Sequence, residues 1–557
     1  MNYKWWKEQV VYQIYPRSFF DANGDGIGDL KGIISKLNYL NLLGIDTLWI
    51  SPHFDSPNDD NGYDIRDYKK VMEEFGTMED FDSLLEECHK KSIRLVIDLV
   101  VNHTSDEHNW FTESRSSKNN SYRDFYIWKK GKGINPPNNW TSFFGGSAWE
   151  KTNETSEYYL HYFSKKQPDL NWDNDKVRES VYELMTFWLN KGIDGFRMDV
   201  IPFISKDQRF FNMSKEELKA PEQFYAKGPK LNTYLKEMNR KVLSKYDIFS
   251  VGEAFGISSE RMMTISDERQ QELDLVLLFD IIRIGRDDWY QGQWKLTQLK
   301  KLFKIQSNTD QFHWPTVFLN NHDNPRSVSK YGNEKKYRVK SAKLLALLTL
   351  TQRGTPFLYQ GEEIGMTNFH FDNIDEFNDL QVKGSLQKVL KNKINKEEYL
   401  KHLNLSSRDH SRTLMQWKNQ PQGGFSKNEN AWFFVNPNYS EINVEDNLKD
   451  PESVFNFYRK IILIRKKSKE LIYANYKDLD PEHSQIFCYK RLGKKQTYLV
   501  ILNFSSDYVK YKIPFFNSKY HLIISNNSDK ILHIKSNFIE LEPWDALMFK
   551  TSNKYEN

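Results

Sequence analysis

Short apolar runs recur along residues 10–361 and indicate buried strands, with amphipathic helices between several of them. The runs number eight and lie at 10–15, 47–50, 93–101, 194–200, 249–254, 273–279, 316–320 and 356–361. In 177–192 the apolar residues fall on one helical face, and Gly192 is placed to end that helix. Eight alternating units predict an α/β fold, a (β/α)₈ TIM barrel.

Two regions break this alternation. Residues 104–174 follow the third strand and are too long for an ordinary loop, so they predict an inserted subdomain. From about 479 short alternating strands predict a C-terminal antiparallel β-sandwich. We expect the charged helical segment 383–403 to be a peripheral insertion. The predicted organisation is a barrel at 1–103 and 175–478, subdomain B at 104–174 and a β domain at 479–557.

The composition is that of a soluble globular protein, with 39% hydrophobic and 28% charged residues. A net charge of +4, from 79 basic and 75 acidic residues, predicts neither a nucleic-acid nor a membrane partner. Two cysteines, Cys88 and Cys488, argue against a disulfide framework. No apolar stretch suits a signal peptide or a membrane span. We therefore expect a cytoplasmic, monomeric enzyme without an organic cofactor.

Three carboxylates stand where apolar runs end, namely Asp199, Glu253 and Asp323. The C-terminal rim of a parallel barrel is where chemistry is expected. Arg197 is placed to keep Asp199 ionised, as a nucleophile requires. Two acids in different environments can divide the roles of nucleophile and general acid in glycoside hydrolysis. Any one acid alone has a structural alternative, but the three together predict catalysis.

Around these acids the sequence resembles glycoside hydrolase family thirteen, the α-amylase clan, and within it the oligo-1,6-glucosidases and sucrose isomerases. The resemblance implies that Asp199 is the nucleophile and Glu253 the general acid and base. It implies that Asp323 stabilises the transition state and orients the sugar hydroxyls. The motifs that carry it run nearly end to end, at 10–30, 58–68, 98–111 and 167–172.

The resemblance also implies a clamp around one non-reducing glucose. Such a pocket must bind the hydroxyls of one glucose and close the far end of that glucose, which limits the enzyme to the terminal sugar of a chain. Lone histidines at strand ends are more often structural, but His103 and His322 share the rim with the triad. The implied substrate-binding residues are Asp60, Tyr63, His103, Phe163, Gln167, Arg197, His322 and Arg412.

On the leaving-group side the implied residues carry two signatures. Val200 resembles the oligo-1,6-glucosidases, because relatives that cleave α-1,4 bonds and the sucrose isomerases commonly have threonine there. Phe255 and Phe279 resemble the aromatic clamp of the sucrose isomerases. Arg283 and Arg286 resemble their arginine-rich loop and would hold a released fructose, with solvated surface charges as the alternative.

The run 21–29 offers oxygens at alternate positions in a loop that glycines make sharp. Hard oxygen donors at this spacing suit Ca²⁺, or Mg²⁺ with retained waters. A turn without metal is the alternative, and an ion here would be structural because the loop lacks the catalytic acids. The candidate ligands are the side chains of Asp21, Asn23, Asp25 and Asp29 and the carbonyl of Ile27.

Together these patterns predict a retaining exo-α-glucosidase for short α-glucosides that prefers α-1,6 bonds, as in isomaltose and isomaltulose. Sucrose isomerisation, in which retained fructose replaces water, stays open because a tenfold shift between the two takes only about 1.4 kcal/mol. A non-catalytic carbohydrate-binding relative is the third hypothesis, and the complete set of acids argues against it.

Overall fold

The computed structural model describes residues 4–286, 289–307, 312–391, 393–514, 520–527 and 537–552. Its centre is a sheet of eight parallel strands that curls into a nearly closed barrel, which confirms the predicted (β/α)₈ barrel. Each strand overlaps one of the eight apolar runs. The strands are β1 (Val11–Ile14), β2 (Thr47–Ile50), β5 (Arg94–Leu99), β9 (Gly195–Met198), β10 (Phe249–Glu253), β11 (Leu275–Leu277), β12 (Thr316–Val317) and β13 (Thr355–Tyr359).

The first strand, β1, pairs with β2 on one side and with the last strand, β13, on the other, and the two ends of the sheet, β11 and β12, face each other. Val11 stands opposite Thr47 on one side and Phe357 on the other. Between β11 and β12, the Thr316 hydroxyl donates to the Val276 carbonyl at 2.8 Å. The barrel centre is a packed apolar core, so chemistry is left to its rim. Residues of this core include Trp6, Val11, Trp49, Val96, Phe249, Val251, Leu275 and Phe357.

Helices cover the outside of the ring. The helix α4 (Asp175–Lys191) buries one face as predicted, and Gly192 ends it at a φ of 104°, where a residue without Cβ is favoured. Other helices are α1 (Leu30–Leu43), α2 (Met78–Lys90), α3 (Asn109–Ser116), α5 (Pro221–Tyr225), α6 (Leu231–Lys241), α7 (Ser259–Ile265), α8 (Leu296–Ser307), α9 (Ser327–Tyr331), α10 (Arg338–Thr351), α11 (Leu380–Lys391), α12 (Lys396–Ser406), α13 (Asp409–Arg412), α14 (Val444–Lys449), α15 (Val454–Lys466) and α16 (Lys469–Tyr473).

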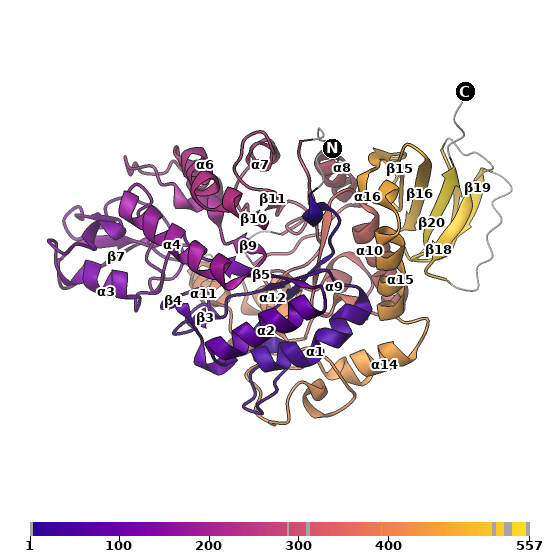
Figure 1. The fold of residues 1–557 in the computed structure, drawn as a ribbon, viewed down its shortest axis with the longest axis horizontal. Helices are drawn as coiled ribbons and strands as arrows, with labels where there is room; N and C mark the ends of the chain where they lie inside the picture. Colours follow the sequence, from indigo (N-terminus) through magenta and orange to yellow (C-terminus); the bar gives the residue numbers. More distant parts are fainter. Residues whose placement is uncertain are drawn as a thin grey trace.

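An insertion projects from the end of β5, at the left of Figure 1. It contains α3 and an antiparallel sheet in the order β6 (Trp128–Lys129), β8 (Tyr158–Leu160) and β7 (Trp149–Lys151). Its two ends meet, since His103 forms a β-bridge with Asp169 and the Leu170 N–H donates to the Asn102 carbonyl at 2.8 Å. This pairing holds the insertion at the C-terminal rim of the barrel. A short hairpin of β3 (Phe54–Asp55) and β4 (Asp67–Val71) lies before it.

The helices α11 and α12 form the segment that the sequence predicts as a peripheral insertion. They build a small apolar core of their own, separate from the barrel interior. The buried members of that core are Phe371, Phe377, Val382, Val389, Tyr399 and Leu403. A compact lobe of this kind can support neighbouring loops at the rim.

The C-terminal region is built from antiparallel sheets, as predicted. One sheet has the order β14-β15-β16-β20-β18 and the other pairs β17 with β19. An apolar core that includes Cys488, Ile501, Tyr511 and Leu541 joins the two sheets. The exact domain boundaries given above stay a prediction. The strands are β14 (Asn475–Asp478), β15 (Ile486–Leu492), β16 (Gln496–Asn503), β17 (Val509–Lys512), β18 (His521–Ser525), β19 (Phe538–Leu541) and β20 (Ala546–Ser552).

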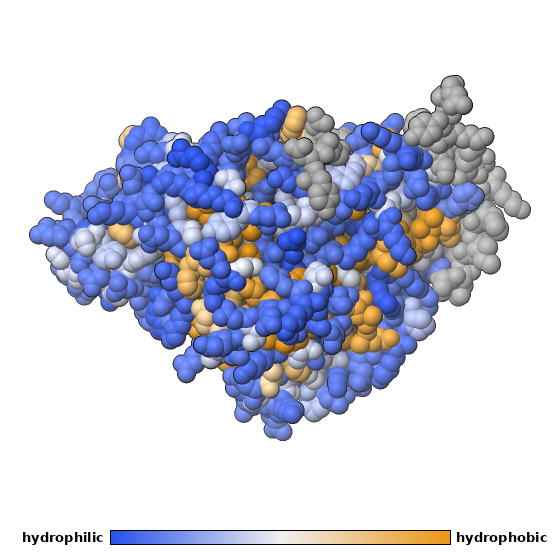
Figure 2. Space-filling model, viewed as in Figure 1, coloured by the Kyte–Doolittle hydropathy of each residue, from blue (hydrophilic) through white to orange (hydrophobic). Residues whose placement is uncertain are grey.

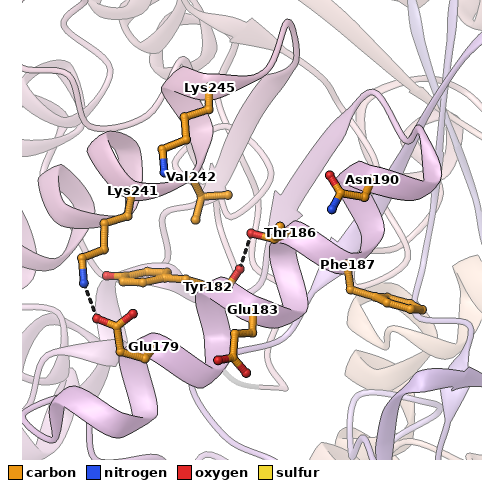
Figure 3. A pocket seen from close by; sticks show the side chains of 9 residues that line it. All are labelled: Glu179, Tyr182, Glu183, Thr186, Phe187, Asn190, Lys241, Val242 and Lys245. Carbon is orange, nitrogen blue, oxygen red and sulfur yellow. Dashed lines mark hydrogen bonds and ion pairs between the residues drawn. The ribbon is translucent and has the colours of Figure 1, made fainter.

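Polar residues dominate one face of the molecule. The face in Figure 2 is largely hydrophilic, with apolar residues in scattered patches. Within the described ranges, no helix combines the length and the apolar character needed to cross a membrane. A hollow of about 580 Å³ lies between α4 and the end of α6, lined by Tyr182, Phe187 and Lys241 among others (Figure 3). It contains none of the three candidate acids, so the site has to be sought elsewhere.

Candidate active site

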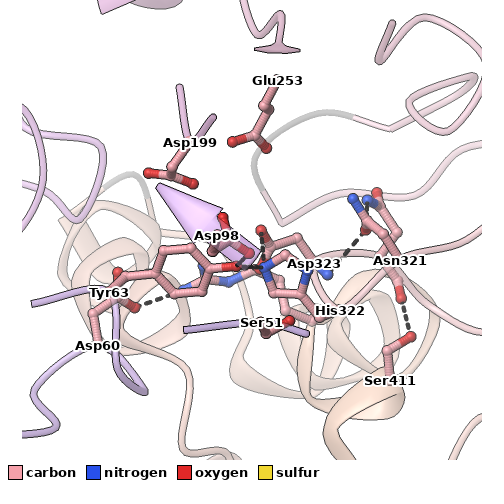
Figure 4. A network of polar contacts seen from close by, with 12 residues as sticks. Ser51, Asp60, Tyr63, Asp98, Asp199, Glu253, Asn321, His322, Asp323 and Ser411 are labelled. Carbon is pink, nitrogen blue, oxygen red and sulfur yellow. Dashed lines mark hydrogen bonds and ion pairs between the residues drawn. The ribbon is translucent and has the colours of Figure 1, made fainter. Parts of the chain in front are cut away.

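The three candidate acids lie together at the C-terminal rim. Asp199 directly follows β9, Glu253 is the last residue of β10, and Asp323 lies in the loop after β12. Figure 4 shows Asp199 and Glu253 next to each other and Asp323 beside His322. The Asp199 and Glu253 side chains are 9% and 5% exposed, whereas that of Asp323 is 23% exposed. Three distant segments therefore build one site, and Asp323 is its most accessible acid.

Arg197 holds the two less accessible acids. Its guanidinium lies 2.7 Å from an oxygen of Asp199 and 2.7 Å from an oxygen of Glu253. A third carboxylate, Asp98, lies 2.6 Å from the same guanidinium and also accepts from the Trp49 indole at 2.9 Å. Asp98 was not among the predicted residues, although it belongs to the 98–111 motif. One fully buried cation thus faces three acidic side chains, so the acidic groups outnumber the positive charge in this part of the site.

The backbone after the candidate nucleophile is strained. Val200 has a left-handed conformation, with φ 35° and ψ 41°, which is rare for a β-branched residue. Such strain costs about 1–3 kcal/mol and persists only where the surroundings enforce it. The conformation aims the Val200 N–H at Oε2 of Glu253, at 3.0 Å. Val200 therefore orients the candidate acid through its backbone as well as lining the site.

Asp199 and Glu253 are coupled through their proximity. Burial raises the pKa of Asp199 well above its ordinary value, Arg197 opposes that shift, and the Glu253 carboxylate adds to it. A neighbouring carboxylate disfavours the ionised form of Asp199, whereas the Arg197 cation favours it. A nucleophile and acid pair needs the negative charge on Asp199 and a proton on the other acid. Arg197 donates to Asp199 at 2.7 Å, and its guanidinium lies equally close to Glu253, so it stabilises a charge on either acid.

His322 ties Asp323 to the barrel. The Gln13 amide nitrogen lies 2.7 Å from Nδ1 of His322, on the side of the ring away from Nε2. That Nε2 lies 2.7 Å from the Tyr63 hydroxyl and 3.2 Å from Oδ2 of Asp323. The Asp323 N–H donates to the Asn321 side chain at 2.9 Å, which fixes the turn. The predicted residues Tyr63, His322 and Asp323 therefore form one connected group (Figure 4).

Two arginines neutralise Asp323. Arg412, which the sequence predicts, lies 2.9 Å from its Oδ1, and Arg408, which was not predicted, lies 3.3 Å from the same oxygen. Burial by itself would raise the pKa of Asp323, but His322, Arg408 and Arg412 together hold it well below its ordinary value. Asp323 is therefore ionised over the whole neutral range. The available signal for Arg408 was its place in the same short segment as Arg412.

The far end of the site is formed by Asp60 and its neighbours. Asp60 accepts from the Gln167 amide at 3.2 Å and lies 3.8 Å from Arg408. Burial raises the pKa of Asp60 to about 7, although Arg408 and other cations oppose the shift. Gln167 also lies 3.2 Å from His103, whose ring faces that of Phe163 at 5.3 Å between centroids. Asp60, His103, Phe163 and Gln167 are thus brought together, as predicted.

The predicted acceptor-side residues divide into two groups. The rings of Phe255 and Phe279 lie 5.7 Å apart, and the Arg283 guanidinium lies 4.9 Å above the Phe255 ring. This group adjoins the end of β10 that carries Glu253. Arg286 is instead bonded inward, since it donates to the Asp323 carbonyl at 3.1 Å and to the Asn324 side chain at 2.7 Å. Arg286 therefore supports the Asp323 loop, whatever else it does.

The predicted metal loop lies before α1, and its carboxylates accept from the loop's own backbone. Asp21 accepts from the Gly24 and Gly26 N–H groups at 2.6 and 2.9 Å. Asp29 accepts from Ala22 at 2.9 Å and caps α1 through Gly32. In the part of the chain that the structure describes, no cluster of three or more Asp, Glu, His or Cys side chains has a metal-binding arrangement. A cation here would depend on the Asn23 and Ile27 oxygens as well.

Residues 13–474 match the family of α-amylase catalytic domains. The chain belongs to the α-amylase family. This member of the family is 48% identical to an oligo-1,6-glucosidase of Bacillus cereus, over 99% of its own length and 100% of that relative. The family resemblance inferred from the sequence motifs is therefore confirmed along the whole chain.

Solved structures of other family members are equally similar. An isomaltulose synthase from Protaminobacter rubrum superposes with a TM-score of 0.97 at 48% identity, covering 100% of both chains. A variant isomaltulose synthase from Erwinia rhapontici NX5, solved with its natural substrate sucrose, gives a TM-score of 0.96 at 48% identity, covering 99% of this family member and 100% of that chain. Relatives named for hydrolysis and for isomerisation thus stand at equal identity.

Proposed function

We propose that this protein is a retaining exo-α-glucosidase that hydrolyses short α-glucosides and prefers α-1,6 bonds. The observation that carries the proposal is the Asp199 and Glu253 pair held by one buried Arg197, in a chain that matches an oligo-1,6-glucosidase end to end. Retaining glycosidases keep their two carboxyl groups only about 5–5.5 Å apart, and two acids sharing one guanidinium suit that spacing. A non-catalytic relative would not need the complete, coupled set of acids.

The reaction follows from the positions of the acids. Asp199 attacks the anomeric carbon and forms a glucosyl ester, while Glu253 gives its proton to the leaving oxygen as the glycosidic bond breaks. Water then attacks the same carbon, Glu253 takes its proton, and Asp199 leaves as a carboxylate. Asp323, ionised beside two arginines, accepts hydroxyl hydrogens of the sugar in the transition state. Two inversions at one carbon release α-glucose.

Substrate preference rests on the two ends of the site. At the far end, the Asp60, Gln167 and Arg408 group supplies hydrogen-bonding partners for one terminal glucose. At the acceptor end, Val200 presents a methyl group where a threonine would present a hydroxyl. A single small contact of this kind is worth about 1–3 kcal/mol, which is enough to bias linkage preference. Isomaltose and isomaltulose are therefore the substrates we propose.

Sucrose isomerisation is the second candidate, and a specific group of residues favours it. Phe255 and Phe279 lie ring to ring beside Glu253, with Arg283 stacked on Phe255. Such a wall would slow the entry of water and keep fructose near the glucosyl ester. The relatives solved as isomaltulose synthases give this candidate the same similarity as the first. We rank hydrolysis ahead because Val200 and the oligo-1,6-glucosidase relative agree with it.

We also propose that the loop at 21–29 binds a structural Ca²⁺, with Mg²⁺ as the alternative. Its donors are all oxygens, the class that Ca²⁺ prefers. Burial raises the pKa of Asp29, backbone N–H groups oppose the shift, and the nearby Asp21 charge adds to it, so a cation would relieve a real repulsion. The ion takes no part in the chemistry. The proposal also includes a cytoplasmic location and a monomeric state.

Hydrolysis of isomaltose followed by proton NMR tests the proposed function. The first glucose released should be the α-anomer, with the β-anomer appearing only at the rate of mutarotation. Asp199→Ala should abolish the signal while circular dichroism and melting temperature stay close to those of the parent. Initial β-glucose would reject the retaining mechanism, and full activity of Asp199→Ala would reject Asp199 as the nucleophile.

A further inference from the structure

The insertion and α11 meet backbone to backbone at two glycines. A Cβ atom added to Gly384 would lie 1.7 Å from the Phe144 carbonyl oxygen and 2.5 Å from its carbon. From the other side, a Cβ on Gly145 would lie 3.0 Å from the Gly384 carbonyl oxygen, at a φ of +92°. Only a residue without a side chain permits this approach. The contact joins segments that are far apart in the sequence and that come from two different parts of the fold.

This contact lies directly behind the glucose clamp. The Phe144 ring packs against Phe163, with 5.8 Å between centroids, and the Arg408 guanidinium lies 5.4 Å above the Phe144 ring. Arg408 in turn contacts Asp323 and Asp60. It also donates to Asp379 at 3.0 Å, the residue immediately before α11. The Phe144 and Gly384 contact therefore forms the next layer outside the residues that face the sugar.

The same layer lies at the end of the site away from the reacting bond. The charges that act on the Asp60 carboxyl most strongly are those of Arg408, Arg412, Asp64 and Asp323, and neither Asp199 nor Glu253 is among them. Glu253 and its neighbours Phe255 and Phe279 face the leaving group instead. A sugar chain that extended beyond the terminal glucose would have to pass between Phe144 and α11.

We propose that the contact between Phe144 and Gly384 closes the far end of the glucose pocket, so that Gly384 makes the enzyme act only at chain ends. The proposal rests on the exo-α-glucosidase function proposed above. A side chain at Gly384 would push the insertion and α11 apart and open a passage beyond Asp60 and Arg408. The enzyme would then accept a disaccharide unit where it now accepts one glucose.

Two chromogenic substrates test this closure. p-Nitrophenyl α-glucoside requires one glucose in the pocket, whereas direct cleavage of nitrophenol from p-nitrophenyl α-isomaltoside requires two. The parent enzyme should release glucose first from the isomaltoside and nitrophenol only after a lag. Gly384→Ala should abolish the lag and raise the ratio of isomaltose to glucose among the first products by about tenfold, within what a single contact can change. Chromatography of the early products measures that ratio.

A matched control separates closure from backbone strain. Gly146 has a φ of +80°, similar to that of Gly145, but nothing lies within 4 Å of the position of its Cβ. Gly146→Ala should therefore keep the parent product ratio, whereas Gly145→Ala should move it in the direction of Gly384→Ala. Phe144→Ala opens the same wall by removing atoms and gives the answer if Gly384→Ala does not fold.

The outcomes are distinct. Isomaltose as an early product of Gly384→Ala or Phe144→Ala supports the closure. Glucose as the only early product of every folded variant overturns it, even if activity falls. A parent enzyme that does not hydrolyse p-nitrophenyl α-glucoside would instead reject the proposed function itself.

Discussion

Arg197 and Arg408 organise opposite ends of the same site. Arg197 faces three carboxylates near the reacting bond, whereas Arg408 contacts Asp60, Asp323 and Asp379 around the far end of the sugar. A buried charge is stable only when it is paired, so each arginine fixes the ionisation of its neighbours as well as their positions. Replacing one of these arginines should therefore change both the pH dependence of activity and the affinity for the sugar.

Removal of Arg408 should move the acid limb of activity. Arg408 is one of three groups that hold the pKa of Asp323 low, against the effect of burial. In Arg408→Met the pKa of Asp323 rises, so the ionised form is lost at higher pH than in the parent. The acid-side limb of kcat/KM should shift upward in pH, measured with isomaltose. Arg209→Met, at an arginine that is 70% exposed, is the control without a shift. A lower activity with an unchanged limb would contradict the electrostatic role.

The sequence identified residues best where a local pattern carries their chemistry. Asp199, Glu253 and Asp323 were visible because each ends an apolar run. Arg408 and Asp379 were not, because their role depends on contacts between distant loops. The left-handed backbone of Val200 was also hidden, since valine disfavours that conformation and only the packed site enforces it.

At the scale of elements, the strands were predictable because strands buried on both faces read as continuous apolar runs. Such a pattern does not predict buried acidic residues, and the turn that follows β13 contains two of them. Glu363 there accepts from the Tyr12 and Tyr39 hydroxyls at 2.8 and 2.6 Å, and the adjacent Glu362 is also buried. Burial and the neighbouring Glu363 raise the pKa of Glu362 to about 8, although a nearby arginine opposes the shift.

Glu362→Gln should flatten the dependence of stability on pH. The folded-state pKa of Glu362, about 8, is above its ordinary value of 4.5, so its favourable contribution is complete below pH 4.5. That contribution is lost progressively as pH rises from 4.5 through 8, because the unfolded state loses the proton first. The melting temperature of Glu362→Gln should therefore fall less than that of the parent across this window. If the melting temperatures of the parent and of Glu362→Gln change equally with pH across this window, Glu362 is not protonated in the folded state.

At the scale of the whole molecule, the barrel, the insertion and the C-terminal sheets follow from changes in pattern along the chain. Their relative packing does not. The close approach of Gly384 to Phe144 joins two segments that are far apart in the sequence. Neither segment carries a sequence motif from which the contact with the other could be predicted. The balance between hydrolysis and isomerisation is hidden for another reason, because about 1.4 kcal/mol changes it tenfold.

Chelation should destabilise the molecule more than it inhibits the reaction. A cation that binds only the folded loop at 21–29 adds stability by mass action. Exhaustive chelation should lower the melting temperature, and added Ca²⁺ should restore it, while activity at moderate temperature changes little. Asp25→Ala should remove the response to Ca²⁺, whereas Asp207→Ala, at a carboxylate paired with Arg209 away from the loop, should keep it. An unchanged melting temperature after chelation would reject the metal site.

The central claim is that water, and not retained fructose, resolves the glucosyl ester. Incubation with sucrose at low concentration, followed by chromatography of the products, tests it most directly. Low concentration matters because transfer to a second sugar grows with acceptor concentration, whereas rearrangement within one bound molecule does not. The account predicts glucose and fructose as the main products. Isomaltulose or trehalulose as the main product would contradict it and assign this family member to the isomerases.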